Sequence, residues 1–335
     1  MLRHLVKLSL LALLACSTPP PAIPSPAATT PSAIEQPSPE RAGDQPHLKV
    51  EVRGPGQVLI EYSGGQLVRS LTPLTFPNPP ATELEGDSPY LDQEVASGVT
   101  YQYSLVDGEQ VLDSSLARVP PKKLPPLHHP RLVVDKVNYT LSVYDRDERV
   151  KRYPFVMGGK PRQRKLCRDN ASTPEGIYTI YNLQPQATFY RAYDIDYPNP
   201  IDRFRYTFAQ RHLELGDPGI GGEIQIHGCG LNGNWTAGCM ALRDADMDEL
   251  FAQPALAAGT RVWIVGREMT MADLEGLSQE HDPEVVRRLQ TSLGLKPDGQ
   301  MGQATREALG LYQHKQGWPV TCQLDQRSLN RLLKQ

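Results

Sequence analysis

The stretch IQIHGCGLNGNWTAGCMAL, residues 224–242, decides the fold and the chemistry that we expect of this chain. Its first residues, 224–226, predict a short buried strand that ends at His227. A thiol attacks as its thiolate, and a free cysteine has a pKa of about 8.5. A histidine held beside Cys239 could take that proton and later return it to a leaving amine. The stretch therefore predicts a Cys–His pair for acyl transfer.

The small residues of the same stretch predict how the backbone supports this pair. Gly228 and Gly238 let the chain come close to a bound carbonyl group, and Thr236 stands beside Gly238 as further support. Amides at Gly238 and Cys239 could face a developing oxyanion. Residues 244–252 predict a helix, and the positive N-terminal end of that helix would lower the pKa of the Cys239 thiol.

Strand patterns surround this stretch. Apolar runs at 132–134, 140–144, 153–157, 177–180 and 261–265 predict strands, with turns at 145–148, 158–159 and 173–176. Because the helical stretch is short, segment 131–266 predicts a domain that is mostly β with little helix.

Four features of segment 131–266, taken in order, resemble the L,D-transpeptidase catalytic (YkuD-type) domain. They are the strands at 133–136 and 141–144, the turn at 172–176, the stretch at 197–203, and His227-Gly228 followed by Thr236, Gly238 and Cys239. The resemblance implies a β-rich fold and a cysteine acyltransferase of the bacterial cell wall. It implies that Cys239 is the nucleophile and His227 the general base, acting on peptidoglycan stem peptides without a cofactor.

The sequence departs from the commonest form of this family at three places. Ala237 stands where His is frequent, Ala241 stands where Arg is frequent, and the loop from His227 to Cys239 is shorter than usual. These departures resemble a divergent branch that includes hydrolytic members. Since Arg is a natural carboxylate clamp, the identity of the acceptor stays open. Arg243 is either a substitute contact for the substrate or a solvated charge at a helix start.

Three functions are compatible with these motifs, in order of preference. The first is an L,D-transpeptidase, and the second is a hydrolase of L,D-linked peptidoglycan peptides or wall-protein linkages. The third is a wall-binding lipoprotein without catalysis. A cysteine protease unrelated to the wall is disfavoured, because papain-like enzymes place Cys before His in the chain and His227 precedes Cys239 here.

Residues 1–16 have the pattern of a bacterial lipoprotein signal peptide. Basic residues precede an apolar stretch that is too short to span a bilayer and ends at Leu-Leu-Ala-Cys, which makes Cys16 the residue to be lipidated. Plain secretion with a chance cysteine is the alternative. Residues 17–46 are rich in Pro, Ser, Thr and Ala and predict an extended linker. By resemblance to enterobacterial lipoproteins, Ser17 after the cysteine implies the outer membrane, so we expect a periplasmic protein attached to that membrane by its lipid.

Two further modules flank segment 131–266. Residues 47–120 alternate with period two at 50–52, 58–62 and 99–105, and they predict a small β-sandwich that resembles fibronectin type III domains. A spacer and a protein-binding module are its two possible roles. Residues 280–335 have helical spacing and resemble the three-helix peptidoglycan-binding domain. A bare helical bundle that packs on the enzyme is the alternative there.

Composition and cysteine positions bear on the remaining partners. A net charge of −3 over 335 residues disfavours non-specific binding of nucleic acid. A zinc site on His227, Cys229 and Cys239 lacks an evident fourth ligand, so we expect no metal. By the family resemblance, the segments around Cys167 and Cys229 border one cleft. That placement favours a Cys167–Cys229 disulfide over two free thiols, with Cys322 left unpaired.

Overall fold

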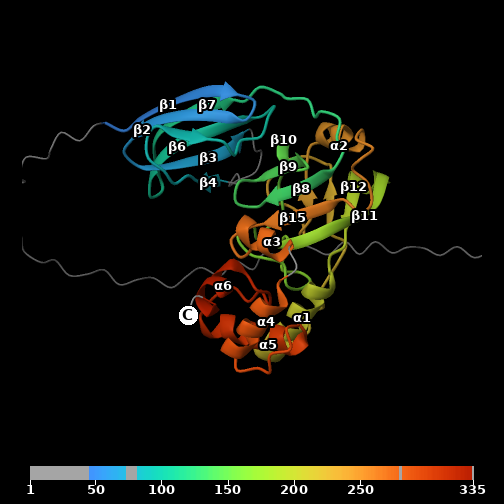
Figure 1. Cartoon of the computed structure of the whole chain (residues 1–335). Helices are drawn as coiled ribbons and strands as arrows, with labels where there is room; N and C mark the ends of the chain where they lie inside the picture. Colours follow the sequence, from blue (N-terminus) through green and yellow to red (C-terminus); the bar gives the residue numbers. More distant parts are fainter. Residues whose placement is uncertain (1–44, 73–80, 279–280, 334–335) are drawn as a thin grey trace, which may run out of the picture. The chain divides into compact units, whose positions relative to one another are not determined.

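The computed structural model describes residues 45–72, 81–278 and 281–333. The expected signal peptide, Cys16 and most of the expected linker at 17–46 therefore lie outside the described residues. The chain from residue 44 onward forms one compact unit. Figure 1 shows the strands and helices of this unit in sequence order. Within the described ranges, no helix is long and apolar enough to cross a membrane.

Seven strands toward the N-terminus form two sheets, one in the order β1-β2-β5 and one in the order β4-β3-β6-β7. The strands are β1 (His47–Gly54), β2 (Gln57–Ser63), β3 (Gln66–Thr72), β4 (Ala81–Glu83), β5 (Tyr90–Asp92), β6 (Thr100–Asp107) and β7 (Gln110–Arg118). Alternate residues of β6 are buried, as expected for a strand with one face on a core. The alternation in the sequence thus predicted β1, β2 and β6 correctly.

A single eight-stranded sheet follows, in the order β10-β9-β8-β15-β11-β12-β13-β14. Its strands are β8 (Pro130–Asp135), β9 (Thr140–Asp145), β10 (Glu148–Pro154), β11 (Gly176–Ala187), β12 (Tyr190–Ile195), β13 (Gln225–His227), β14 (Met240–Ala241) and β15 (Arg261–Val265). β15 runs parallel to β8, and β13 runs parallel to β14. Fully buried aliphatic side chains such as Leu132, Ile226 and Ile264 belong to its core, so the β-rich fold expected of this segment is confirmed.

Two local expectations for this segment were wrong. The strand expected at 153–157 ends at Pro154, because it is the last part of β10. The segment also holds a 13-residue helix, α1 (Pro200–His212), where we expected none. The Asn199 side chain accepts from the amides of Ile201 and Asp202, and the Asp202 carboxylate accepts from the Asn199 amide. This capping box starts the helix.

Residues 119–130, the α2-bound linker, run along α2 (Asp244–Phe251). Leu124 and Leu127 are buried in this linker. Their amides donate to Glu249 Oε1 at 2.7 Å and to Gln253 Oε1 at 3.2 Å. The proline-rich stretch is therefore fixed by both apolar burial and hydrogen bonds. Helix α2 itself confirms, to within one residue, the helix expected at 244–252.

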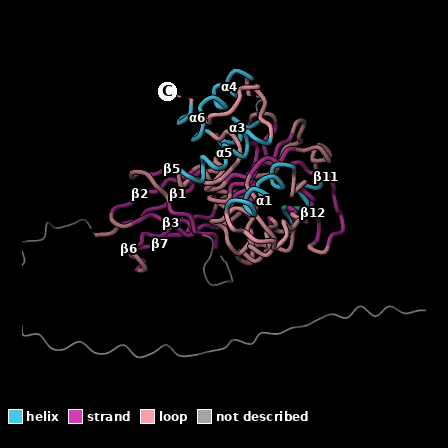
Figure 2. Tube along the Cα trace, turned by 90° about the horizontal axis from the view of Figure 1, so that it is seen from below, coloured by secondary structure: helices cyan, strands magenta, loops and turns pink. Residues whose placement is uncertain are grey.

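Four helices lie together toward the C-terminus, as Figures 1 and 2 both show. They are α3 (Met271–Ser278), α4 (Pro283–Ser292), α5 (Gln303–Lys315) and α6 (Gln326–Leu332). Buried leucines at 289, 309, 324 and 332 form the core of the last three helices. The helical spacing in residues 280–335 predicted these three correctly, whereas α3 was not expected.

Candidate active site

His227 is the last residue of β13, and its ring is 1% exposed. Its Nδ1 lies 2.8 Å from the carbonyl oxygen of Gly228. Because a carbonyl oxygen only accepts, Nδ1 carries the hydrogen and Nε2 keeps its lone pair. The Phe189 ring stacks on the imidazole at 4.9 Å between centroids, and the Trp235 ring meets it edge-on at 5.6 Å. These contacts fix the plane of the ring.

Burial lowers the pKa of the His227 imidazole, and the hydrogen bond to Gly228 partly opposes this effect. An imidazole with a lowered pKa is neutral at pH 7, which is the form that can accept a proton. His227 therefore has both the tautomer and the charge state of a general base.

The pairing of β13 with β14 brings the chain at Cys239 beside the strand that ends at His227. His227 pairs with Ala241, and Ile226 pairs with Met240. Cys239 directly precedes Met240, the first residue of β14. The two residues that the sequence singled out are thus carried by neighbouring segments of the same sheet.

The nucleophile loop, residues 236–239, is closed by the hydroxyl of Thr236. Thr236 Oγ1 donates to the Cys239 carbonyl at 2.7 Å and accepts from the Gly238 amide at 3.2 Å. Gly238 has φ of +138°, and a Cβ there would come within 2.6 Å of the Ser172 carbonyl oxygen. The supporting roles expected of Thr236 and Gly238 therefore have a physical basis. The Gly238 amide is bonded to Thr236, however, which leaves the Cys239 amide as the candidate oxyanion donor.

Gly228 has a similar steric role on the histidine side. A Cβ on Gly228 would lie 2.5 Å from Asp244 Oδ1 and 2.9 Å from the Tyr190 Cβ. Its amide donates to the carbonyls of Phe189 and Arg191. Gly228 thus permits close packing beside His227, and its amide is not directed at a substrate.

The thiol of Cys239 is partly exposed and donates to the Glu223 carbonyl, with Sγ 3.5 Å from that oxygen. Burial raises the pKa of this thiol, and the Asp194 and Glu223 carboxylates raise it further. A backbone hydrogen bond from Gln225 and the charge of Lys165 lower it. We expected a helix directly after Cys239 to lower this pKa. That expectation was wrong, because β14 separates Cys239 from the start of α2 at Asp244.

Lys165 was not singled out from the sequence, yet it reaches the nucleophile loop. Its side chain is 4% exposed, and Nζ donates to the Ala237 carbonyl at 3.2 Å. Burial lowers the pKa of its ammonium group, while Cys167, Cys239 and Asp169 raise it. The site therefore contains a buried cation in addition to the thiol and the imidazole.

Asp194 lies on the same sheet and is held by amide groups. Its carboxylate accepts from Asn182 Nδ2 at 2.6 Å, from Gln184 Nε2 at 2.8 Å and from Gln225 Nε2 at 2.6 Å. Three neutral donors satisfy the carboxylate without a cation. Asp194 is close enough to Cys239 to raise the pKa of its thiol, and the alternation of apolar residues in the strands did not predict this.

Arg243 is paired within the protein, which argues against the substrate contact considered for it. Its Nε lies 2.7 Å from Asp246 Oδ2, its second terminal nitrogen lies 2.8 Å from Asp246 Oδ1, and its first donates to the Gly98 carbonyl at 2.9 Å. Because a bidentate carboxylate occupies the guanidinium, it is not free to bind a substrate. Ala241, next to His227, is fully buried.

The Cys167–Cys229 disulfide is also corrected, because both residues are free thiols, as are Cys239 and Cys322. The Cys229 amide donates to Asp244 Oδ1 at 2.7 Å, which holds this residue against the start of α2. The amide of the next residue after Cys167, Arg168, donates to the Gly219 carbonyl at 2.7 Å. The two thiols are therefore anchored to different loops.

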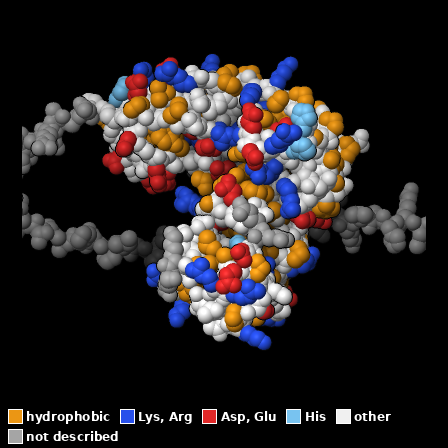
Figure 3. Space-filling model, in the orientation of Figure 1, with side chains coloured by type: hydrophobic (Ala, Val, Ile, Leu, Met, Phe, Trp, Pro, Cys, Tyr) orange, Lys and Arg blue, Asp and Glu red, His pale blue; other side chains and the backbone are white. Residues whose placement is uncertain are grey.

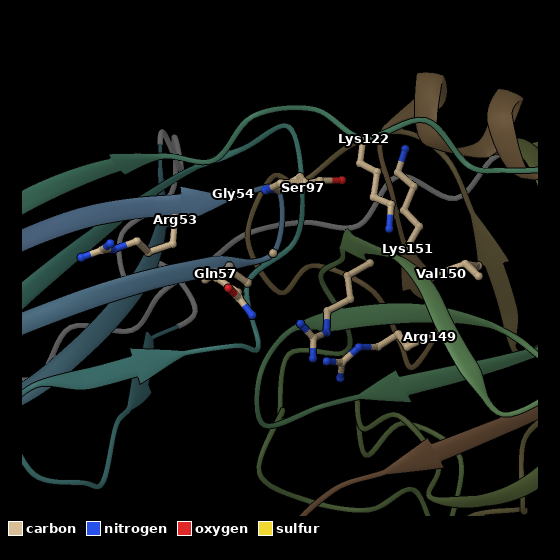
Figure 4. A pocket seen from close by; sticks show the side chains of 12 residues that line it. Arg53, Gly54, Gln57, Ser97, Lys122, Arg149, Val150 and Lys151 are labelled. Carbon is tan, nitrogen blue, oxygen red and sulfur yellow. The ribbon is translucent and has the colours of Figure 1, made fainter.

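A cavity of about 290 Å³ elsewhere collects basic side chains (Figure 4). Lys122, Arg149 and Lys151 lie on one side of the view and Arg53 on the other. Lys151 pairs with Glu249, Arg149 lies 3.4 Å from Glu94, and Arg53 lies 2.8 Å from Glu51, so most of this charge is neutralised. The face drawn in Figure 3 likewise mixes basic and acidic side chains. No group of three or more His, Cys, Asp or Glu residues within the described ranges could hold a metal ion.

The family comparison bears directly on this site. The model of the L,D-transpeptidase catalytic domain, YkuD, matches residues 129–264. That segment is a YkuD-type domain. The match confirms the resemblance stated from the sequence and contains both His227 and Cys239. The resemblance of residues 280–335 to a peptidoglycan-binding domain stays a prediction. No curated protein matches the chain.

Solved structures also resemble parts of this chain. An L,D-transpeptidase of Xylanimonas cellulosilytica is 15% identical, covers 43% of this chain and 64% of its own, and has a TM-score of 0.29. Bdellovibrio bacteriovorus Bd1075 is 24% identical, with 42% and 48% covered and a TM-score of 0.31. An L,D-transpeptidase of Stackebrandtia nassauensis is 14% identical, with 43% and 60% covered and a TM-score of 0.28. Each of these three matches spans less than two thirds of the solved chain.

Proposed function

We propose that this protein is an L,D-transpeptidase that acts on peptidoglycan stem peptides, with Cys239 as nucleophile and His227 as general base. The observation that carries the proposal is the β13–β14 pairing, which brings the chain at Cys239 beside the strand that ends at His227. The bond from Nδ1 to Gly228 leaves Nε2 free to accept the thiol proton. The YkuD match supports a substrate from peptidoglycan.

The proposed reaction has two halves. In the first, Nε2 of His227 takes the Cys239 proton, the thiolate attacks the peptide carbonyl carbon, and the Cys239 amide faces the resulting oxyanion. Collapse breaks the peptide bond, and the imidazolium gives its proton to the leaving amine. In the second half, an acceptor amine attacks the thioester and His227 takes its proton. The new amide forms as the C–S bond breaks, which restores the thiol.

The experiment is mass spectrometry of tetrapeptide-containing muropeptides after incubation with the purified full chain. We expect crosslinked dimers joined through two diaminopimelate residues. Cys239→Ala should abolish them, and His227→Ala should slow their formation severely. Cys229→Ala is the matched control, because the Cys229 backbone amide is bonded to Asp244 and its thiol has no part in the proposed chemistry, so this variant should remain active. Turnover in Cys239→Ala would overturn the proposal.

Hydrolysis is the second candidate, and the pairing of Arg243 with Asp246 favours it. With Arg243 occupied and Ala241 buried, neither position offers a clamp for the carboxylate of an acceptor. Water could then compete with an amine for the thioester. Tripeptide products alone, with excess acceptor present, would assign the protein as a hydrolase.

We further propose that Cys16, which is followed by Ser17, is lipidated and holds the enzyme on the periplasmic side of the bacterial outer membrane. Helices α4–α6 would bind peptidoglycan and raise the local concentration of substrate. Membrane fractionation of the wild type and of Cys16→Ser tests the anchor. Pull-down of the chain with purified sacculi, with and without residues 281–335, tests the helical module.

A further inference from the structure

Lys165 has a fixed position that the proposed chemistry does not yet use. Its amide donates to the Thr173 carbonyl at 3.2 Å, and the neighbouring Arg164 forms a β-bridge with Thr173. At the other end of the side chain, Nζ donates to the Ala237 carbonyl at 3.2 Å. A lysine on a surface normally extends its amine into water. Here the backbone and the amine are both held, with the amine against the nucleophile loop.

The ammonium group of Lys165 has N–H donors that remain without an acceptor among the described residues. An ammonium has three N–H donors, and the described residues supply a single acceptor, the Ala237 carbonyl. No carboxylate of the described residues forms an ion pair with it, although Asp169 is near enough to influence its titration. A buried cation without a paired anion is costly, so it is expected where a negative charge develops during function.

The groups around Cys239 indicate that this negative charge is the thiolate of Cys239. Burial, Asp194 and Glu223 all oppose formation of a thiolate at Cys239. His227 is neutral before it takes the proton, so it gives no positive charge to the resting thiol. Lys165 is the cation that acts on Cys239 in the opposite direction. The other groups that act on Lys165 itself are Cys167 and Asp169.

We infer that Lys165 is an electrostatic positioning residue, whose ammonium group holds the Ala237 carbonyl and stabilises the thiolate of Cys239. Lys165 stays protonated throughout, and the thiol proton goes to Nε2 of His227 as before. The inference rests on the proposed role of Cys239 as nucleophile. It adds a residue from a different loop, 72 positions earlier than the carbonyl it holds.

The test is the rate of Cys239 alkylation by iodoacetamide as a function of pH, read by mass spectrometry of the Cys239 peptide. Lys165→Met keeps the size of the side chain and removes the charge. We expect the midpoint of the pH profile to rise by about half to one pH unit, which lowers the rate at pH 7 about three- to tenfold. The rate at high pH, where every thiol is ionised, should stay at the wild-type level.

Three further variants make the test specific. Lys165→Gln keeps a donor for the Ala237 carbonyl without the charge, and it should shift the profile as Lys165→Met does. Lys165→Arg keeps the charge and should restore most of the wild-type midpoint. Lys160→Met removes an exposed lysine of the same loop and should leave the profile unchanged. Thermal unfolding of each variant confirms that the profile refers to folded protein, and Lys165→Gln carries the test if Lys165→Met does not fold.

An unchanged midpoint in Lys165→Met and Lys165→Gln would overturn the inference. So would a uniform fall in rate at every pH, because that is the mark of a damaged loop. Alkylation needs no substrate, so this result is separate from the proposed function. If the wild type forms no product from muropeptides, the proposed function fails while the alkylation shift still reports on Lys165. If products form and the midpoint does not move, the inference alone fails.

Discussion

Two buried lysines of the YkuD-type segment have opposite surroundings. Lys136 is 3% exposed, and its Nζ lies 2.7 Å from Glu175 Oε1, with the Gln163 and Thr173 carbonyls at 2.7 Å and 3.0 Å. Lys165 is 4% exposed, with one carbonyl as its acceptor. Burial lowers the pKa of both ammonium groups. The same cost of burial is therefore offset inside the fold for Lys136 and left largely uncompensated for Lys165.

Glu175, the partner of Lys136, has all its further hydrogen-bond partners inside the fold. Its second oxygen accepts from the amides of Glu268 and Met269 at 3.0 Å and 2.9 Å. The ion pair thus ties the end of β8 and the start of β11 to the chain before α3. A charge with all its partners inside the fold contributes to structure, whereas a charge with spare donors beside a reactive group is available for chemistry.

The largest effect that this contrast predicts is on stability. Lys136→Met should lower the free energy of unfolding by about 3–5 kcal/mol, because Glu175 is left buried without its cation. Lys165→Met should cost only about 1 kcal/mol, the loss of one hydrogen bond. Urea denaturation of both variants measures the difference. Equal losses in the two would mean that the charge of Lys165 is also structural.

A smaller effect on stability, dependent on pH, is expected from His227, a buried base that also lacks a carboxylate partner among the described residues. Burial lowers its pKa in the folded state, so below the unfolded value of about 6.5 the unfolded chain binds the proton more readily. Stability should therefore rise with pH through this window, and fall as pH drops from 7.5 to 5. His227→Gln should flatten this slope.

The control for that slope is His281, whose pKa is also lowered by burial. Unfolding curves of His281→Gln at the same pH values separate the two contributions. If His227→Gln retains the full wild-type slope, the dependence belongs to other groups.

The smallest effect is expected at Arg243, a cation that is paired like Lys136 but lies nearer to solvent. Arg243→Met should leave muropeptide turnover within about twofold of wild type, since the guanidinium is bound to Asp246. The free energy of unfolding should fall by less than about 1 kcal/mol, because the pair is partly exposed. A tenfold loss of turnover with unchanged stability would indicate that Arg243 contacts the substrate.

The sequence predicted those parts of the site that are local in the chain. His227, Thr236, Gly238 and Cys239 lie within one stretch, so their spacing and their strand pattern could be recognised together. The pair of Arg243 with Asp246 is also local, three residues apart at a helix start, and could have been foreseen from that spacing.

Contacts between distant segments could not be predicted in the same way. Lys165 meets Ala237 across 72 residues, and nothing in the local pattern around Lys165 distinguishes it from a solvated lysine. The error at α1 had a different cause. Its start signal, Asn199 with Asp202 and a proline between them, was readable from the sequence. It was missed because the stretch at 197–203 was interpreted through the family resemblance alone.

The α2-bound linker has a consequence for how the chain can be divided. Proteases cut where about ten residues can leave the surface and enter an active site, which unpacked linkers allow readily. Residues 119–130 have the composition of such a linker, but Leu124 and Leu127 are buried, and their amides are bonded to Glu249 in α2 and to Gln253 just after it. Cleavage there would require both leucines to leave their pockets together. The seven strands before it and the sheet after it should therefore be released by proteolysis as one fragment.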